Sequence, residues 1–190
     1  MPFPEPMHPN SDEKPLPQWF VMRDLKRPNA KCRAYQWPAE QGFEVFTPMK
    51  WEVTGTGARK TRRCRPFLFD LLFVHSTRES LDPVVSLTPT LQYRFLRGSA
   101  LGVPMTVREA DMDFFMRAVQ ATEEPRYFTP GEITPAMLGK FIRVVGGPFD
   151  GYEGRLLSVR GTRKRHLLVE VPTVLATTVE IDPEYIELLK

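Results

Sequence analysis

The residues of this chain best suited to chemistry are cationic. Five positive charges fall within seven residues, at Arg59, Lys60, Arg62, Arg63 and Arg65. Arginine and lysine neutralise phosphate, so one interpretation is a surface that contacts the backbone of a nucleic acid. The other interpretation is a solvated hairpin arm, which is what most charge runs are. Residues 54–57, Thr-Gly-Thr-Gly, predict a flexible tip just before the cluster, and the sequence leaves both interpretations open.

Nucleophiles and metal ligands form no recognisable set. Histidines at positions 8, 75 and 166 lack cysteine or carboxylate partners at ligand spacing, so we expect no metal and no cofactor. No Gly-x-Ser-x-Gly motif is present, and no pair of carboxylates stands in a context that marks a general acid and base. We therefore expect that the protein is not an enzyme.

Composition sets the outer limits of the prediction. The chain has 190 residues, enough for one large or two small domains, and a net charge of only +3. The overall attraction to nucleic acid is then modest, and local clusters matter more. The chain has only two cysteines, Cys32 and Cys64, which predicts free thiols in a reducing cytoplasm. It has no long apolar run and no secretory-type N-terminus, so we expect a cytoplasmic protein without membrane contact.

A glycine-rich stretch, Gly146–Gly154, separates two apolar runs. It holds four glycines in nine residues, which predicts positive φ angles or places where a side chain would clash. With Pro148 it reads as a rigid turn between strands. We expect Phe149 to enter the core. For Tyr152 two interpretations remain: an exposed anchor for a partner, or a ring folded over Leu156.

The apolar run 66–74 alternates in a way that predicts one strand. Phe67, Phe69, Leu71 and Phe73 would share one side of it. Such a strand is either covered on both sides or offers one side to a partner, and burial is the simpler interpretation for most of these side chains. Later in the chain, Thr106 and Glu109 predict a capping box, followed by a helix with an apolar stripe.

Composition also predicts the boundaries between domains. Residues 1–17 hold six of the nineteen prolines and read as a disordered extension, and residues 121–137 read as a linker. After the linker, strand-like patterns recur and suggest a small barrel. These patterns are 140–145, 154–159, 166–171, 173–181 and 184–189.

Residues 18–190 resemble the NusG family of transcription factors. The glycine turn resembles its KOW motif through Val144-Val145, Gly147-Pro148-Phe149 and Gly154. The other anchors are Trp19-Phe20-Val21, Phe46-Thr47-Pro48, Arg65-Pro66 before Phe73-Val74, and Pro104 before a helix. The resemblance implies an α+β chain. It would comprise an N-terminal four-stranded antiparallel sheet with flanking helices over 18–120 (an NGN-like domain), a linker over 121–137, and a five-stranded, Src-homology-3-like KOW barrel over 138–190.

The resemblance also implies a function and partners. The protein would be a monomeric elongation or antitermination factor, and its first domain would bind RNA polymerase, with Phe67, Phe69, Leu71 and Phe73 as the apolar surface. The basic cluster would meet nucleic acid of the elongation complex. The KOW domain would recruit a ribosomal protein or termination factor through Phe149 and Tyr152.

One departure from the family pattern stands out. Phe69-Asp70-Leu71 occupies the place of the usual Pro-Gly-Tyr-like turn, so Leu71 replaces the aromatic ring expected there. The proline-rich start and the Trp37-Pro38 step favour a specialised paralogue of the kind that acts on operons such as those for surface polysaccharides.

An alternative is a ribosome- or RNA-associated KOW protein that binds RNA directly. A second basic cluster in the C-terminal part favours it: Arg160, Arg163, Lys164, Arg165 and His166.

Overall fold

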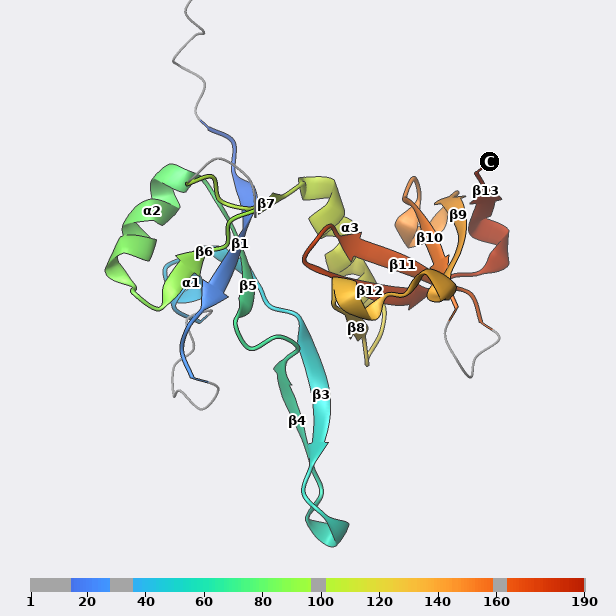
Figure 1. The fold of residues 1–190 in the computed structure, drawn as a ribbon, viewed down its shortest axis with the longest axis horizontal. Helices are drawn as coiled ribbons and strands as arrows, with labels where there is room; N and C mark the ends of the chain where they lie inside the picture. The colour runs from blue at the N-terminus through green and yellow to red at the C-terminus, as the bar shows by residue number, and fades with distance from the viewer. Residues whose placement is uncertain (1–14, 28–35, 97–101, 159–163, 190) are drawn as a thin grey trace, which may run out of the picture.

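The computed structural model describes residues 15–27, 36–96, 102–158 and 164–189 (Figure 1). The predicted extension up to residue 14 lies outside the described residues, as do Arg160 and Arg163. The described part is α+β, with antiparallel sheets and helices α1 (Gln36–Glu40), α2 (Arg78–Leu87) and α3 (Glu109–Gln120). Short 3-10 turns add Gly57–Arg59 (η1), Pro130–Glu132 (η2), Pro135–Met137 (η3), Gly147–Phe149 (η4) and Pro183–Tyr185 (η5).

The first sheet has the strand order β2-β5-β1-β6, and β7 pairs separately with β1. Its strands are β1 (Gln18–Asp24), β2 (Glu44–Phe46), β5 (Leu71–Ser76), β6 (Leu91–Tyr93) and β7 (Thr106–Val107). All pairings are antiparallel. The four-stranded path agrees with the expectation, and β7 is an addition to it.

Both faces of this sheet are covered. Trp19 and Val21 of β1 face a core that includes Phe115 of α3, whereas Phe20 packs on the opposite side in a cluster with Leu81 of α2. Strand alternation places successive side chains on opposite faces, so helices on both sides explain the continuous apolar runs 19–22 in β1 and 71–74 in β5.

The run 66–74 is not one strand, contrary to the sequence prediction. Strand β4 (Thr61–Pro66) ends at Pro66, a turn follows, and β5 begins at Leu71. The turn is closed by a hydrogen bond from the amide of Leu71 to the carbonyl of Leu68, at 3.3 Å. Asp70 stabilises it, because its carboxylate pairs with Arg23 at 3.5 Å and with Arg94 at 3.0 Å.

Helix α3 carries the expected stripe but lacks the expected capping box. Met112 and Phe115 are fully buried. Thr106 instead lies in β7, and the residue at the helix N-cap is Arg108 without a side-chain cap. The Glu109 carboxylate is directed to His75, whose Nε2 lies 3.2 Å from it. A long-range contact thus replaces the local one.

The second sheet has the order β13-β9-β10-β11-β12-β8. Its strands are β8 (Arg126–Phe128), β9 (Leu138–Val144), β10 (Glu153–Leu157), β11 (His166–Val171), β12 (Leu175–Glu180) and β13 (Ile186–Leu188). Five of them match the five predicted strands, and β8 is added from the predicted linker. The predicted closed barrel is wrong for the described residues. Their pairing is an open path, and β8 rather than another barrel strand occupies the free edge of β12.

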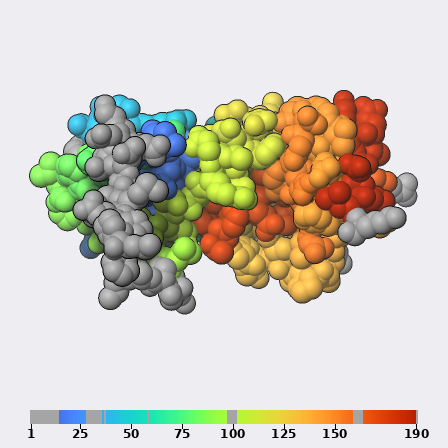
Figure 2. All heavy atoms as spheres, turned by 90° about the horizontal axis from the view of Figure 1, so that it is seen from above, coloured from blue at the N-terminus to red at the C-terminus, as the bar shows by residue number. Residues whose placement is uncertain are grey.

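Helix α3 joins the two sheets. It contacts β1 of the first sheet and β11 and β12 of the second (Figure 1). One cluster of buried residues therefore continues from Trp19 through Phe115 to Val169. Seen from above, the residues of α3 lie between the blue-green and orange-red parts of the molecule (Figure 2). The boundaries 18–120, 121–137 and 138–190 stay a prediction about separately folding units.

A separate two-stranded hairpin leaves the first sheet. It consists of β3 (Met49–Thr54) and β4, which pair only with each other among the strands of the structure's described part. Its far end projects away from both sheets (Figure 1). In the part of the chain that the structure describes, no helix is long and apolar enough to cross a membrane.

Candidate nucleic-acid interface

The β3–β4 hairpin carries the basic cluster. Residues 49–66 hold six basic side chains and one carboxylate, a formal charge of +5, whereas the whole chain has +3. The rest of the protein is therefore net negative, and its positive charge is concentrated in this one projection. A projecting element of one sign attracts a polyanion much more strongly than the modest net charge suggests.

Strand register divides the hairpin into two faces. Lys50 lies opposite Arg65 and Glu52 lies opposite Arg63, so these four residues share a polar face. Lys50 forms an ion pair with Glu52 at 2.8 Å, and the hydrogen bond from Lys50 lowers the pKa of the Glu52 carboxyl. The guanidinium groups of Arg63 and Arg65 on this face belong to the cluster predicted to contact the backbone of a nucleic acid.

The other face of the hairpin is apolar and exposed. It carries Trp51, opposite Cys64, and Val53, opposite Arg62. Trp51 is 47% exposed and Val53 is 66% exposed. The Arg62 guanidinium carbon lies 4.5 Å from the centre of the Trp51 ring, a cation–π geometry. Sequence reasoning missed Trp51; the alternation of 49–54 against the basic residues of 61–66 was the available signal.

Arg62 also ties the hairpin to the segment after α3. Its Nη2 donates to Glu124 Oε1 at 2.6 Å, and both side chains are exposed. At the base of the hairpin, the Tyr127 hydroxyl donates to the carbonyl of Met49 at 3.2 Å. Burial raises the pKa of Tyr127 to about 12. The base of the hairpin is anchored, while its apolar face stays open.

The four residues predicted to bind polymerase are not brought to one surface. Leu71 and Phe73 are 1% and 0% exposed and belong to the core. Phe67 is half-buried and packs on Tyr127, with ring centres 5.1 Å apart. Only Phe69, at the turn before β5, exposes a substantial part of its ring, 38%. In this arrangement the sheet face that carries Leu71 and Phe73 is covered, and Phe69 is the member open to a partner.

The glycine turn folds as its sequence predicts. Gly146, Gly147 and Gly151 have φ angles of 90°, 70° and 79°, which L side chains rarely adopt. Gly154 is required for a different reason, because a Cβ there would lie 2.5 Å from the Tyr152 ring. The Asp150 carboxylate completes the turn by accepting a hydrogen bond from the amide of Gly146 at 2.6 Å.

Tyr152 and Phe149 have different surroundings in the structure. Tyr152 is half-buried against Phe114 of α3, with ring centres 5.0 Å apart. Its hydroxyl donates to the Leu168 carbonyl at 3.1 Å and accepts from the Glu170 amide at 3.2 Å. Burial raises the pKa of Tyr152 to about 12. The ring thus seals the contact between α3 and the second sheet in this arrangement.

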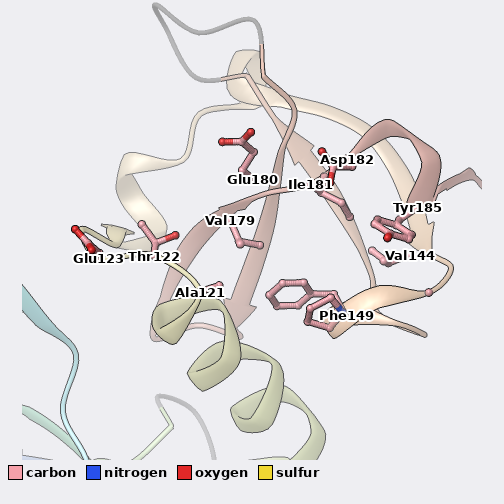
Figure 3. Close-up of a pocket in the computed structure, with 12 residues that line it drawn as sticks. Ala121, Thr122, Glu123, Val144, Phe149, Val179, Glu180, Ile181, Asp182 and Tyr185 are labelled. Atoms are coloured by element: carbon pink, nitrogen blue, oxygen red, sulfur yellow. The ribbon is translucent and has the colours of Figure 1, made fainter.

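Phe149 is 6% exposed, as expected for a core residue, and it lies on the floor of a pocket of about 450 Å³ (Figure 3). The pocket lies between the end of α3 and the ends of β9 and β12. Its apolar lining includes Val144, Val179 and Tyr185. Carboxylates of Glu123, Glu180 and Asp182 stand around it, and Lys164 pairs with Glu180 at 2.7 Å.

In the described residues, no three His, Cys, Asp or Glu side chains gather as a metal-binding group. His75 lies between Glu44, 3.1 Å from its Nδ1, and Glu109. The imidazole also stacks on Trp19, with ring centres 5.0 Å apart. These contacts tie β2, β5 and α3 together.

Comparisons with known proteins add a structural likeness. No family model matches the chain, and no curated protein matches it. A solved structure that concerns domain interaction in Thermotoga maritima NusG is similar at 16% sequence identity and a TM-score of 0.43. The likeness covers 92% of this chain and 98% of that one. The proposals below rest on the residues of this chain.

Proposed function

We propose that this protein is a transcription elongation or antitermination factor of the NusG type, with the β3–β4 hairpin as its contact to nucleic acid. The observation that carries the proposal is the concentration of charge: the hairpin has a formal charge of +5 in a chain of +3. The hairpin is anchored at its base and its far end projects away from both sheets (Figure 1), so the exposed Arg59, Lys60 and Arg63 can reach a polyanion beside a larger partner.

The polar face of the hairpin supports backbone contacts. Arg63 is exposed and lies on the same face as the half-buried Arg65. Guanidinium groups on a short ribbon neutralise phosphates without selecting a base, so binding should depend on salt rather than on sequence. RNA polymerase is the proposed larger partner, because the motifs of residues 18–190 resemble those of the NusG family. Phe69, in the turn before β5, is the accessible part of the proposed docking surface.

A paused elongation complex tests this function directly. Full-length protein should bind the complex formed with its cognate RNA polymerase and shorten the pause. Arg63→Glu should reduce that effect several-fold and lower the slope of log affinity against log salt by about one unit or more, since each lost phosphate contact contributes roughly 0.9. An unchanged pause with Arg63→Glu would support the solvated-arm interpretation instead.

A matched variant discriminates the RNA-associated alternative. Arg165 is exposed just before β11 and belongs to the other basic cluster, so Arg165→Glu makes the same charge change elsewhere. We expect Arg165→Glu to retain activity on the paused complex. Loss of RNA binding with Arg165→Glu, together with full activity of Arg63→Glu, would favour direct RNA binding by the C-terminal sheet. The partner recruited by that sheet is proposed to be a ribosomal protein or termination factor.

A further inference from the structure

We propose that the apolar face of the β3–β4 hairpin binds single-stranded nucleic acid by stacking an unpaired base on Trp51. The inference rests on the proposed contact between this hairpin and nucleic acid. It goes further, because it names the strand state that is bound and the side chain that recognises it. Phosphate contacts on the polar face would serve single and double strands alike, whereas a stacked base requires a strand whose bases are unpaired.

The exposure pattern of β3 is the first observation in favour of stacking. Trp51 and Val53 are exposed, whereas the polar residues that alternate with them, Lys50, Glu52 and Thr54, are half-buried. A strand that packs for stability alone buries its apolar residues and exposes the polar ones. The reverse order leaves an indole, 47% exposed, on a ribbon whose open face no other strand of the described chain covers. An exposed aromatic of this kind is typical of a contact surface.

The positive charge around Trp51 favours a nucleic acid over an apolar protein as the ligand of this face. Arg62 stands beside Trp51 on it, and Arg59 and Lys60 follow the tip of the same hairpin. An apolar protein partner would have to desolvate these cations, whereas a single strand offers a phosphate for each cation and a π-face for the indole. Aromatic side chains interleaved with Arg and Lys are the usual surface for single strands. A duplex cannot use Trp51 in this way, because its bases are already stacked on each other.

The geometry of Arg62 fits a site that opens when a strand binds. Its guanidinium covers the Trp51 ring at 4.5 Å and is held by Glu124 at 2.6 Å. Glu124 is 72% exposed at its side chain, and an exposed ion pair is worth little, so a phosphate can replace this carboxylate at small cost. The released guanidinium then lies beside the base on the indole, where it adds a second planar contact.

The strand lengths set the scale of the site. Six residues in each of β3 and β4 extend roughly 20 Å, at about 3.4 Å per residue. An oligonucleotide of about 12 nucleotides lies within the usual range of single-strand site sizes. The sugar plays no part in a stacked contact, so DNA and RNA of one sequence should bind with similar affinity.

Fluorescence anisotropy with a labelled oligonucleotide tests the inference on the full chain. Wild type should bind the single strand at least several-fold more tightly than the blunt duplex of the same sequence. Trp51→Ala should weaken single-strand binding by about tenfold, within the range known for one stacked base, and leave duplex binding unchanged. Trp51→Phe should recover part of the loss. Val53→Ala is the matched control, since Val53 is on the same face and more exposed but cannot stack.

Salt dependence and intrinsic fluorescence separate stacking from charge. Trp51→Ala should lower affinity equally at all salt concentrations, whereas Arg63→Glu should change the salt slope. Quenching of tryptophan emission by the oligonucleotide should be strong in wild type and largely lost in Trp51→Phe.

Each failure has a distinct meaning. If wild type binds neither single strand nor duplex, the proposed nucleic-acid contact of the hairpin fails, and the stacking inference fails with it. If wild type binds both and Trp51→Ala changes neither, stacking alone is overturned and the backbone-reading hairpin stands. Equal loss of single-strand and duplex binding in Trp51→Ala would make Trp51 a structural residue of the hairpin and would also overturn the inference.

Discussion

The hairpin and the glycine turn are two projections of similar sequence character, and the fold treats them in opposite ways. Each is a strand pair with glycines at its tip and an aromatic residue close by. Trp51 of the hairpin is 47% exposed, whereas Tyr152 of the glycine turn is half-buried against Phe114. The difference comes from α3, which packs closely on β11 and β12 of the second sheet and makes no contact of comparable extent with the hairpin in the described residues.

This contrast shows what an aromatic residue near a turn can and cannot predict. Glycine requirements are local, so the sequence correctly places special backbone angles at Gly146, Gly147 and Gly151. Exposure of the neighbouring ring is not local. It depends on whether an element distant in sequence, here α3, covers it. Substitutions in the two regions should therefore differ in effect, from a large loss of stability at buried positions to a small change at exposed ones.

Leu71→Asp should unfold the first sheet. Leu71 is 1% exposed in the core, so the substitution buries a charge that has no partner and should cost about 4 kcal/mol or more. Phe69→Asp, two residues earlier in the exposed turn, is the control and should change stability by about 0.5 kcal/mol or less. Urea denaturation of both variants measures this. A folded Leu71→Asp protein would return Leu71 to the proposed polymerase surface.

Phe149→Ala should destabilise the protein more than Tyr152→Phe does. Phe149 is 6% exposed, and truncating a buried phenylalanine costs about 3–5 kcal/mol. Tyr152→Phe keeps the ring on Phe114 but removes a hydroxyl with two hydrogen bonds to β11, at about 1–3 kcal/mol. Thermal denaturation gives the order. If Tyr152→Phe leaves the stability unchanged, water must replace the two hydrogen bonds of the hydroxyl. Tyr152 would then be exposed to solvent in the way that Trp51 of the hairpin is.

Stability should fall at alkaline pH because of the tyrosines at the junction. Burial raises the pKa of Tyr127 and of Tyr152 to about 12, from the ordinary 10. Their contribution is complete below pH 10, where both states are protonated. It is lost as pH rises through the folded pKa, at up to about 1.4 kcal/mol per pH unit for each group. Denaturation between pH 9 and about 12 should show a shallower loss in Tyr152→Phe; an identical slope would contradict the assignment.

Most strands of this fold could be predicted from the sequence, whereas the arrangement of side chains on the candidate interface could be predicted only in part. The four-stranded path of the first sheet was expected from the family resemblance, and the five strands of the second sheet from the strand-like patterns that recur after residue 137. The addition of β8 could not be predicted, because Arg126–Phe128 reads as linker until β12 offers it an edge. The capping box failed in a similar way, since Glu109 finds His75 across the fold. For the site, the charge cluster was evident, but the two faces of the hairpin appear only with the register of β3 against β4.

Glu124→Gln gives the smallest expected effect and the sharpest test of the exposed projection. Loss of the ion pair to Arg62 should lower stability by only about 0.2–1 kcal/mol, since both groups are exposed. The same change should tighten binding of a single-stranded oligonucleotide by about 1.4- to 5-fold, because a phosphate no longer has to displace the carboxylate. Glu123→Gln removes an equal charge next to it, and Glu123 forms no ion pair with the hairpin among the residues that the structure describes. If both variants gain affinity equally, the gain is a general effect of net charge. If Glu124→Gln alone gains, then a weak internal partner, the Glu124 carboxylate, holds Arg62 away from its ligand.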